Sequence, residues 1–182
     1  DGIVISVTNP CDLVAYHLNR KISSQVIGSG TMLDSARFRC RIAEELSVDT
    51  NSVQAWCFGE HGDSQVPVWS QVHINGVTLN DYLTGRDSSD VEKMKDKISK
   101  STIYAGWEIA SKKGNTEFGV GMSVLPCSIL LNGEYGERDV YASVLCRIGK
   151  DGAFPVKGVP LQLEEEEAFH ESCRIMRGAY PE

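Results

Sequence analysis

The sequence predicts a mixed α/β fold of the α+β type, in which antiparallel strands accompany long helices. Residues 3–7 and 140–149 are runs of β-branched and other apolar side chains that are typical of strands. Residues 72–79 alternate around an Asn-Gly pair that favours a β-hairpin turn. Residues 88–113 carry apolar side chains at helical spacing, which predicts one long helix.

The first half of the chain gives a clear order of elements. Residues 3–7 should form a buried strand. A helix then begins near Pro10, with Asp12 beside its positive end. Gly28-Ser29-Gly30 resembles the start of a phosphate-binding turn but lacks the third glycine, so we interpret it as the turn before a second helix. That helix is predicted to run to about Leu46.

The second half adds further elements. Residues 53–58 should form a buried strand, and Asp87 should cap the long helix. Another helix is predicted from Asn115 to about Leu131. Residues 164–167 are an acidic run that favours the start of the last helix, where the helix dipole stabilises negative charge.

Composition excludes several classes of function. The formal net charge of −7 argues against nucleic acid as a partner, and no apolar run approaches membrane-spanning length. The six cysteines form no C-x-x-C pair, so we expect buried thiols of a cytoplasmic protein. The four histidines lack the spacing of zinc ligands, and no metal site is predicted.

The segment Gly59-Glu60-His61-Gly62-Asp63-Ser64 is the centre of the functional argument. It holds a histidine between two glycines, directly after a predicted buried strand. Glycines at a strand end let the backbone turn sharply and let another molecule approach closely. A histidine exchanges a proton near neutral pH, because its unperturbed pKa is about 6.5. Taken alone, the segment is better explained as a capped loop with a surface histidine.

A second segment favours a functional role for His61 over an ordinary surface loop. Asp34 and Arg37 are three residues apart on a predicted helix, so they share one face. A carboxylate can fix the tautomer of a histidine, and an arginine can bind a substrate carboxylate through two hydrogen bonds. His61, Asp34 and Arg37 would together make a proton-transfer site for a small carboxylic acid. The alternative is that Asp34 and Arg37 form an ordinary surface ion pair of little weight.

The two segments together resemble the L-lactate/malate dehydrogenase superfamily. Leu33-Asp34-Ser35-Ala36-Arg37-Phe38-Arg39 and the His61 segment carry the resemblance, and Val66-Pro67-Val68-Trp69-Ser70 is similar to the lactate branch. The resemblance runs to about Gly178 and covers only the later half of the family. It implies that residues 1–20 are the last strand and following helix of the dinucleotide-binding domain. Residues 21–182 would then be the C-terminal catalytic domain, without most of the Rossmann domain.

The resemblance implies reversible, NAD-dependent interconversion of L-lactate and pyruvate. His61 would exchange the hydroxyl proton, Asp34 would stabilise the imidazolium, and Arg37 would anchor the substrate carboxylate. Asn9 would lie beside the nicotinamide and the substrate, although a helix N-cap role is compatible with it.

Three further positions follow from the same resemblance. Thr116 would contact the substrate side chain, with a simple helix cap as the alternative, and Val120 would contact the nicotinamide ring. Arg39 matches an arginine that binds fructose 1,6-bisphosphate in bacterial relatives. Gln54 stands where the partner histidine of that site would be, which argues against such regulation.

The family also supplies a mobile-loop arginine and a glycine-rich cofactor unit that this sequence does not contain. We therefore expect the 182-residue chain to be inactive alone, to expose an apolar face, and to form a homotetramer only when complete. Malate or another L-2-hydroxy acid is an alternative substrate. An alternative of another class is a non-catalytic interaction or oligomerisation domain.

Overall fold

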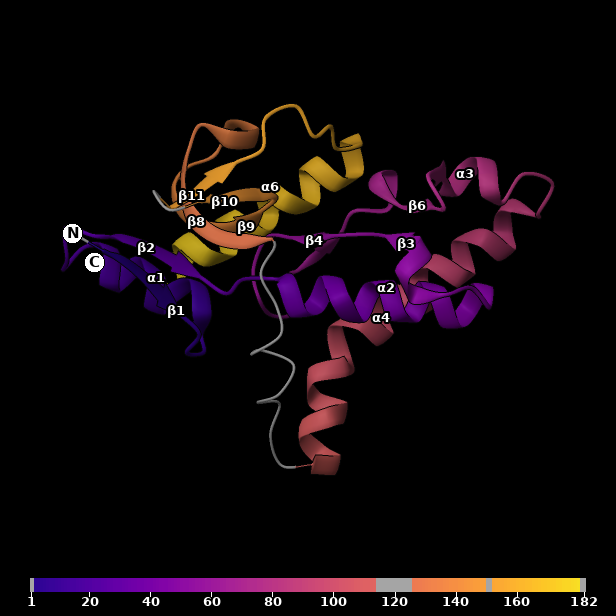
Figure 1. Ribbon diagram of the computed structural model, residues 1–182, viewed down its shortest axis with the longest axis horizontal. Helices are drawn as coiled ribbons and strands as arrows, with labels where there is room; N and C mark the ends of the chain where they lie inside the picture. Colours follow the sequence, from indigo (N-terminus) through magenta and orange to yellow (C-terminus); the bar gives the residue numbers. More distant parts are fainter. Residues whose placement is uncertain (1, 114–125, 150–151, 181–182) are drawn as a thin grey trace.

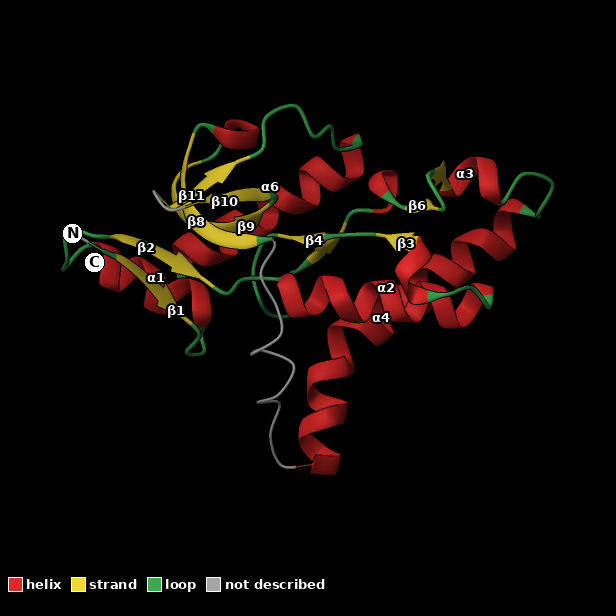
Figure 2. Ribbon diagram, in the orientation of Figure 1, coloured by secondary structure: helices red, strands yellow, loops and turns green. Residues whose placement is uncertain are grey.

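The computed structural model describes residues 2–113, 126–149 and 152–180, and it confirms the α+β class (Figure 2). The helices are α1 (Cys11–Asn19), α2 (Met32–Leu46), α3 (Leu79–Tyr82), α4 (Ser88–Lys113) and α6 (Leu163–Gly178). The strands are β1 (Ile3–Ser6), β2 (Gln25–Gly28), β3 (Val53–Gln54), β4 (Cys57–Phe58), β5 (Val66–Pro67), β6 (His73–Ile74), β7 (Val77–Thr78), β8 (Cys127–Asn132), β9 (Arg138–Val144), β10 (Cys146–Gly149) and β11 (Gly152–Pro155).

The largest sheet has four strands in the order β1-β2-β8-β9. β1 and β2 are parallel, whereas β8 is antiparallel to both of its neighbours. Helix α1 contacts β2, β8 and β9, and α1, β1 and β2 lie at the end of the molecule that holds both termini (Figure 1). This arrangement places the start of α2 directly after the second strand of the sheet.

Two expectations about strands and helices were wrong in part. The helix predicted to reach about Leu131 does not extend there, because residues 127–132 form β8 in the middle of the sheet. An apolar run of this length suits a helix or a buried strand, and pairing with β9 decides the outcome. Residues 3–7 were expected to be buried, yet Ile5 is 66% and Val7 is 58% exposed. Ile3, Ile5 and Val7 alternate along the strand and so share one face, and all three are exposed.

Two further predicted strands are interrupted. The strand expected over residues 53–58 is divided into β3 and β4, which belong to different sheets. The strand expected over residues 140–149 breaks at Leu145 into β9 and β10. The hairpin is confirmed, since β6 and β7 pair antiparallel around Asn75 and Gly76, both with positive φ.

Helices α2 and α4 follow their predicted signals. Asp87 caps α4 by accepting the backbone N–H groups of Ser89 and Asp90. The first part of α4 packs against α2, and its last turns extend away from the rest of the protein (Figure 1). Tyr104 and Trp107 on this part are 62% and 76% exposed.

The core consists of two main clusters of buried side chains. One lies between β8, β9 and α6 and includes Phe58 and Phe169, and the other joins α2 to β3, β6 and α4 around Phe38. All six cysteines are free thiols, and five of them are buried as expected: Cys11, Cys57, Cys127, Cys146 and Cys173. Within the described ranges, no helix has the length and apolar character required to cross a bilayer.

Candidate active site

Helix α2 starts against the sheet because of one glycine. Gly30 has φ of +57°, and a Cβ on it would lie only 2.4 Å from Ser143 Oγ and 2.7 Å from the backbone nitrogen of Ser128. Only glycine fits that approach. The turn therefore presses the first residues of α2 onto β8 and β9, and Asp34 is almost fully buried at 1% exposure.

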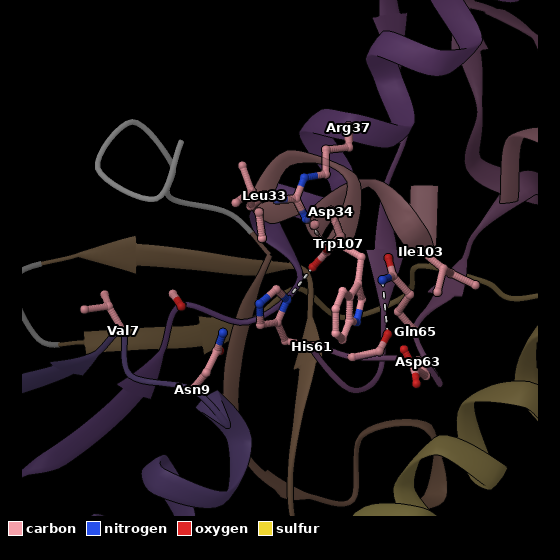
Figure 3. A pocket seen from close by; sticks show the side chains of 14 residues that line it. Val7, Asn9, Leu33, Asp34, Arg37, His61, Asp63, Gln65, Ile103 and Trp107 are labelled. Carbon is pink, nitrogen blue, oxygen red and sulfur yellow. Dashed lines mark hydrogen bonds and ion pairs between the residues drawn. The ribbon is translucent and has the colours of Figure 1, made fainter. Parts of the chain in front are cut away.

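Asp34 is the link between the two predicted segments (Figure 3). One of its oxygens, Oδ2, lies 2.6 Å from His61 Nδ1. The other, Oδ1, accepts a hydrogen bond from Arg37 Nη1 at 3.1 Å. The side chains of Arg37 and His61 are 13% and 21% exposed, so both reach solvent at the cavity surface. The structure thus brings together the three residues that the sequence analysis placed in one site.

The environment of His61 favours its protonated form. Burial lowers the pKa of His61, but the hydrogen bond and the negative charge of Asp34 raise it, with a smaller contribution from Asp12. The raising effects win, so the pKa of His61 lies above its ordinary value. An imidazole held in this way can accept a proton from a substrate hydroxyl and return it.

Asp12 is a site residue that the sequence analysis missed. It is 2% exposed, and its Oδ2 accepts the backbone N–H of His61 at 2.9 Å. Its Oδ1 accepts the hydroxyl of Ser128 at 2.5 Å. Burial raises the pKa of Asp12 despite these hydrogen bonds. The only signal in the sequence is a carboxylate at the start of a largely apolar helix, where a favourable interaction with the helix dipole already accounts for it.

A cavity of about 380 Å³ opens beside this array. It is lined by Val7, Asn9, Ser29, Leu33, Asp34, Arg37, His61, Gly62, Asp63, Gln65, Ile103, Gly106, Trp107 and Ala110. The indole of Trp107 extends from α4 into the space beside His61 (Figure 3). Trp107, Ile103 and Ser29 were also missed, and only their proximity in the fold reveals them.

The remaining predicted residues divide into three groups. Asn9 lines the cavity at its exposed rim, and Pro10 rather than Asn9 occupies the N-cap position of α1. Arg39 lies outside the cavity lining. Its Nη1 bonds to the Ala55 carbonyl at 3.3 Å, and its guanidinium lies 5.7 Å from the ring centre of Trp56. Thr116 and Val120 fall outside the described residues.

The site combines a histidine, a buried carboxylate that contacts it, and an arginine at the cavity wall. This arrangement suits an enzyme that moves a proton on a small carboxylic acid. Residues 31–179 match the alpha/beta C-terminal domain of lactate/malate dehydrogenases. The chain belongs to this family.

Known relatives agree with this assignment. The L-lactate dehydrogenase of Macrococcus caseolyticus is 39% identical over 97% of this chain, and that of Fusobacterium nucleatum is 35% identical over the same share. The minor L-lactate dehydrogenase from Enterococcus mundtii superposes with a TM-score of 0.86 at 32% identity over 98% of this chain. The malate dehydrogenase from Aeropyrum pernix superposes with a TM-score of 0.86 at 28% identity over 98% of this chain.

The chain spans only part of each of these proteins. It covers 61% of the two curated relatives and 62% and 63% of the two structures.

Proposed function

We propose that this chain carries the substrate side of an NAD-dependent L-lactate dehydrogenase, which interconverts L-lactate and pyruvate. The observation that supports this most strongly is the contact of Asp34 with both His61 and Arg37 inside one cavity. The names of the relatives support the same activity.

The chemical roles follow from the contacts. Asp34 occupies Nδ1 of His61, so Nε2 is the nitrogen that takes the hydroxyl proton of lactate and returns it to the keto oxygen of pyruvate. Asp34 stabilises the imidazolium that forms. Arg37 binds the substrate carboxylate at the cavity wall, where its guanidinium is partly exposed.

The cavity also fits part of the cofactor. NAD supplies the hydride acceptor when it is bound. Asn9 and Ser29 offer an amide and a hydroxyl at the rim next to His61, and Val7 offers an exposed apolar surface. These groups suit the carboxamide and the flat ring of a nicotinamide. We propose that Asn9, Ser29 and Val7 would hold that end of the cofactor, with Val120 as a further candidate.

The lining favours a monocarboxylate substrate. Leu33, Ile103 and Trp107 give the cavity apolar walls, and Asp63 adds a negative charge. Among the described lining residues, Arg37 is the single arginine or lysine. A second carboxylate, as in malate, would find no second arginine or lysine among these described lining residues. This supports lactate over malate, the alternative that the structural similarity to the Aeropyrum pernix enzyme keeps open.

We also propose a cytoplasmic location and a tetramer of complete chains. Free, buried thiols suit a reducing compartment. The exposed apolar side chains of β1 and α4 offer surface for association, which also suits a non-catalytic interaction domain.

The test is NADH consumption with pyruvate or oxaloacetate by the 182-residue chain, with His61→Ala as the control. We propose little turnover by the chain alone, because its sequence lacks the family's glycine-rich cofactor unit. Turnover near that of an intact enzyme would contradict the proposed low activity of the isolated chain. A binding role that survives His61→Ala would favour the interaction domain.

A further inference from the structure

The loop that carries His61 is held by helix α6 as well as by the residues already described. Ser172 lies in α6 and is fully buried. Its Oγ accepts the backbone N–H of Glu60 at 2.9 Å and lies 3.1 Å from Ser64 Oγ. One hydroxyl therefore contacts the residue before His61 and a residue three positions after it.

The available hydrogens determine the direction of the hydrogen bonds among Glu60, Ser64 and Ser172. Glu60 Oε2 accepts the hydroxyl of Ser64 at 2.5 Å and its backbone N–H at 3.2 Å. Ser64 has one hydroxyl hydrogen, which an ionised Glu60 accepts. Ser172 must then donate its own hydrogen to Ser64 Oγ while it accepts the N–H of Glu60. Every hydrogen of this small network has one assigned partner.

Two further contacts join α6 to the same loop. Gly59 has φ of +83°, and a Cβ on it would lie 2.6 Å from Ser172 Oγ. At the other end, Glu165 of α6 accepts the backbone N–H of Ser70 at 2.7 Å and also its hydroxyl. Glu165 and Ser172 are seven residues apart, about two helical turns, and so lie on one face of α6. This face of α6 therefore binds Glu60, shortly after β4, and Ser70, shortly after β5.

We propose that Ser172 is a positioning residue, because its buried hydroxyl binds the backbone before His61 and the Ser64 side chain after it, and so keeps the imidazole against Asp34. The contact that depends on it is the 2.6 Å distance between His61 Nδ1 and Asp34 Oδ2. His61 lies in a loop outside the sheets, so anchors of this kind fix its place. The importance of this role for proton transfer rests on the function proposed above.

Removing the hydroxyl of Ser172 should weaken the hydrogen bond between His61 and Asp34. The charged groups around the imidazole are Asp34 and Arg37 of α2, Asp12 of α1, and Glu60 and Asp63 of its own loop, and the substitution removes none of these charges. A change in the proton affinity of His61 would therefore report a change in its position.

The experiment is an NMR titration of the histidines in the complete 182-residue chain, without substrate or cofactor. The signal of His61 is assigned by its loss in His61→Gln. In Ser172→Ala we expect the titration midpoint of His61 to fall by about half a pH unit, roughly a threefold loss of proton affinity. His170 serves as an internal reference, because it lies on α6 two residues before Ser172 and contacts Glu137.

The matched control is Thr102→Val, which removes another fully buried hydroxyl. Thr102 Oγ1 donates to the Ile98 carbonyl within α4 and not to the loop. We expect the midpoints of His61 and His170 to stay unchanged in this variant. If Ser172→Ala leaves His61 unchanged, or shifts His170 together with it, the hydroxyl has a purely structural role and the inference fails.

A second variant keeps the test decisive if Ser172→Ala does not fold. Ser64 is only half-buried, so Ser64→Ala breaks the same network from the exposed side. We expect the midpoint of His61 to fall in Ser64→Ala and to return in Ser64→Thr, which restores the hydroxyl. An unchanged midpoint in Ser64→Ala contradicts the inference. Because the titration needs no turnover, its outcome is independent of activity. Absence of turnover in a complete enzyme that contains this chain would overturn the proposed function and leave this inference standing.

Discussion

Asp34 binds His61 and Arg37 with separate oxygens, Oδ2 at 2.6 Å from His61 Nδ1 and Oδ1 at 3.1 Å from Arg37 Nη1. One buried carboxylate thus contacts both the proposed proton carrier and the proposed anchor of the substrate carboxylate. Any change to Asp34 should affect acid–base chemistry and substrate binding together.

Asp34→Asn should lower the pKa of His61. Burial lowers that pKa in the native chain, and the hydrogen bond and charge of Asp34 are the main effects that oppose it. With a neutral amide in place of the carboxylate, the lowering effect of burial on the pKa of His61 should dominate. The NMR midpoint of His61 measures the shift, and an unchanged midpoint would show that Asp34 does not control the imidazole.

The same pKa shift predicts a pH dependence of stability. The folded-state pKa of His61 is raised, so protonated His61 contributes stability that is fully present below its unfolded pKa. That contribution is lost as the pH rises from about 6.5 through the folded-state pKa. Urea denaturation across this range should show a steeper loss of unfolding free energy in the native chain than in His61→Gln. Equal slopes would contradict the prediction.

Arg37→Lys should weaken substrate binding while it preserves the positive charge. A lysine cannot form two parallel hydrogen bonds to a carboxylate. In an active enzyme that contains this chain, we expect KM for pyruvate to rise roughly 10- to 100-fold, as expected for a lost hydrogen bond to a charged group. A kcat that falls with KM unchanged would assign Arg37 a different role.

Asp12 offers a comparison between two substitutions. Asp12→Ala leaves the N–H of His61 without this buried acceptor and should cost about 1–3 kcal/mol of unfolding free energy. Asp12→Asn can still accept that N–H and can donate to Ser128 Oγ, so it should cost less. Its lost charge should also lower the pKa of His61. Equal stability of the two variants in urea denaturation would refute this account.

Gly106→Ala should change stability and binding in opposite directions. Alanine favours a helix over glycine by about 1 kcal/mol, so the melting temperature should rise or stay unchanged. The new Cβ would lie 3.3 Å from Arg37 Nη1 and would displace the guanidinium, so KM should rise. Gly178→Ala in α6 is the control, because a Cβ there meets nothing within 4 Å. A change in KM in both variants, or in neither, would rule out the contact as the cause.

The sequence predicted what depends on local patterns. Residues at helical spacing placed Asp34 beside Arg37, and the Asn-Gly pair located the hairpin. Contacts between distant segments could not be predicted in this way. Asp12 and Ser172 meet the His61 loop across 49 and 112 positions of sequence, and no local pattern marks either residue.

The errors have a similar origin. The run that includes residues 127–131 is apolar enough for a helix or a buried strand, and only its neighbour β9 resolves the choice. The β-branched run at residues 3–7 correctly predicted a strand but not its exposure. Burial depends on which elements cover a strand, and this information lies elsewhere in the chain.

The most direct test of the proposed site is activity in a complete enzyme. Residues 1–182 would replace the matching 61% of the Macrococcus caseolyticus L-lactate dehydrogenase, which is 39% identical to this chain. We predict that the hybrid oxidises NADH with pyruvate and that His61→Asn abolishes this while NADH binding persists. A folded hybrid that binds NADH but does not reduce pyruvate, or one whose turnover survives His61→Asn, would contradict the account.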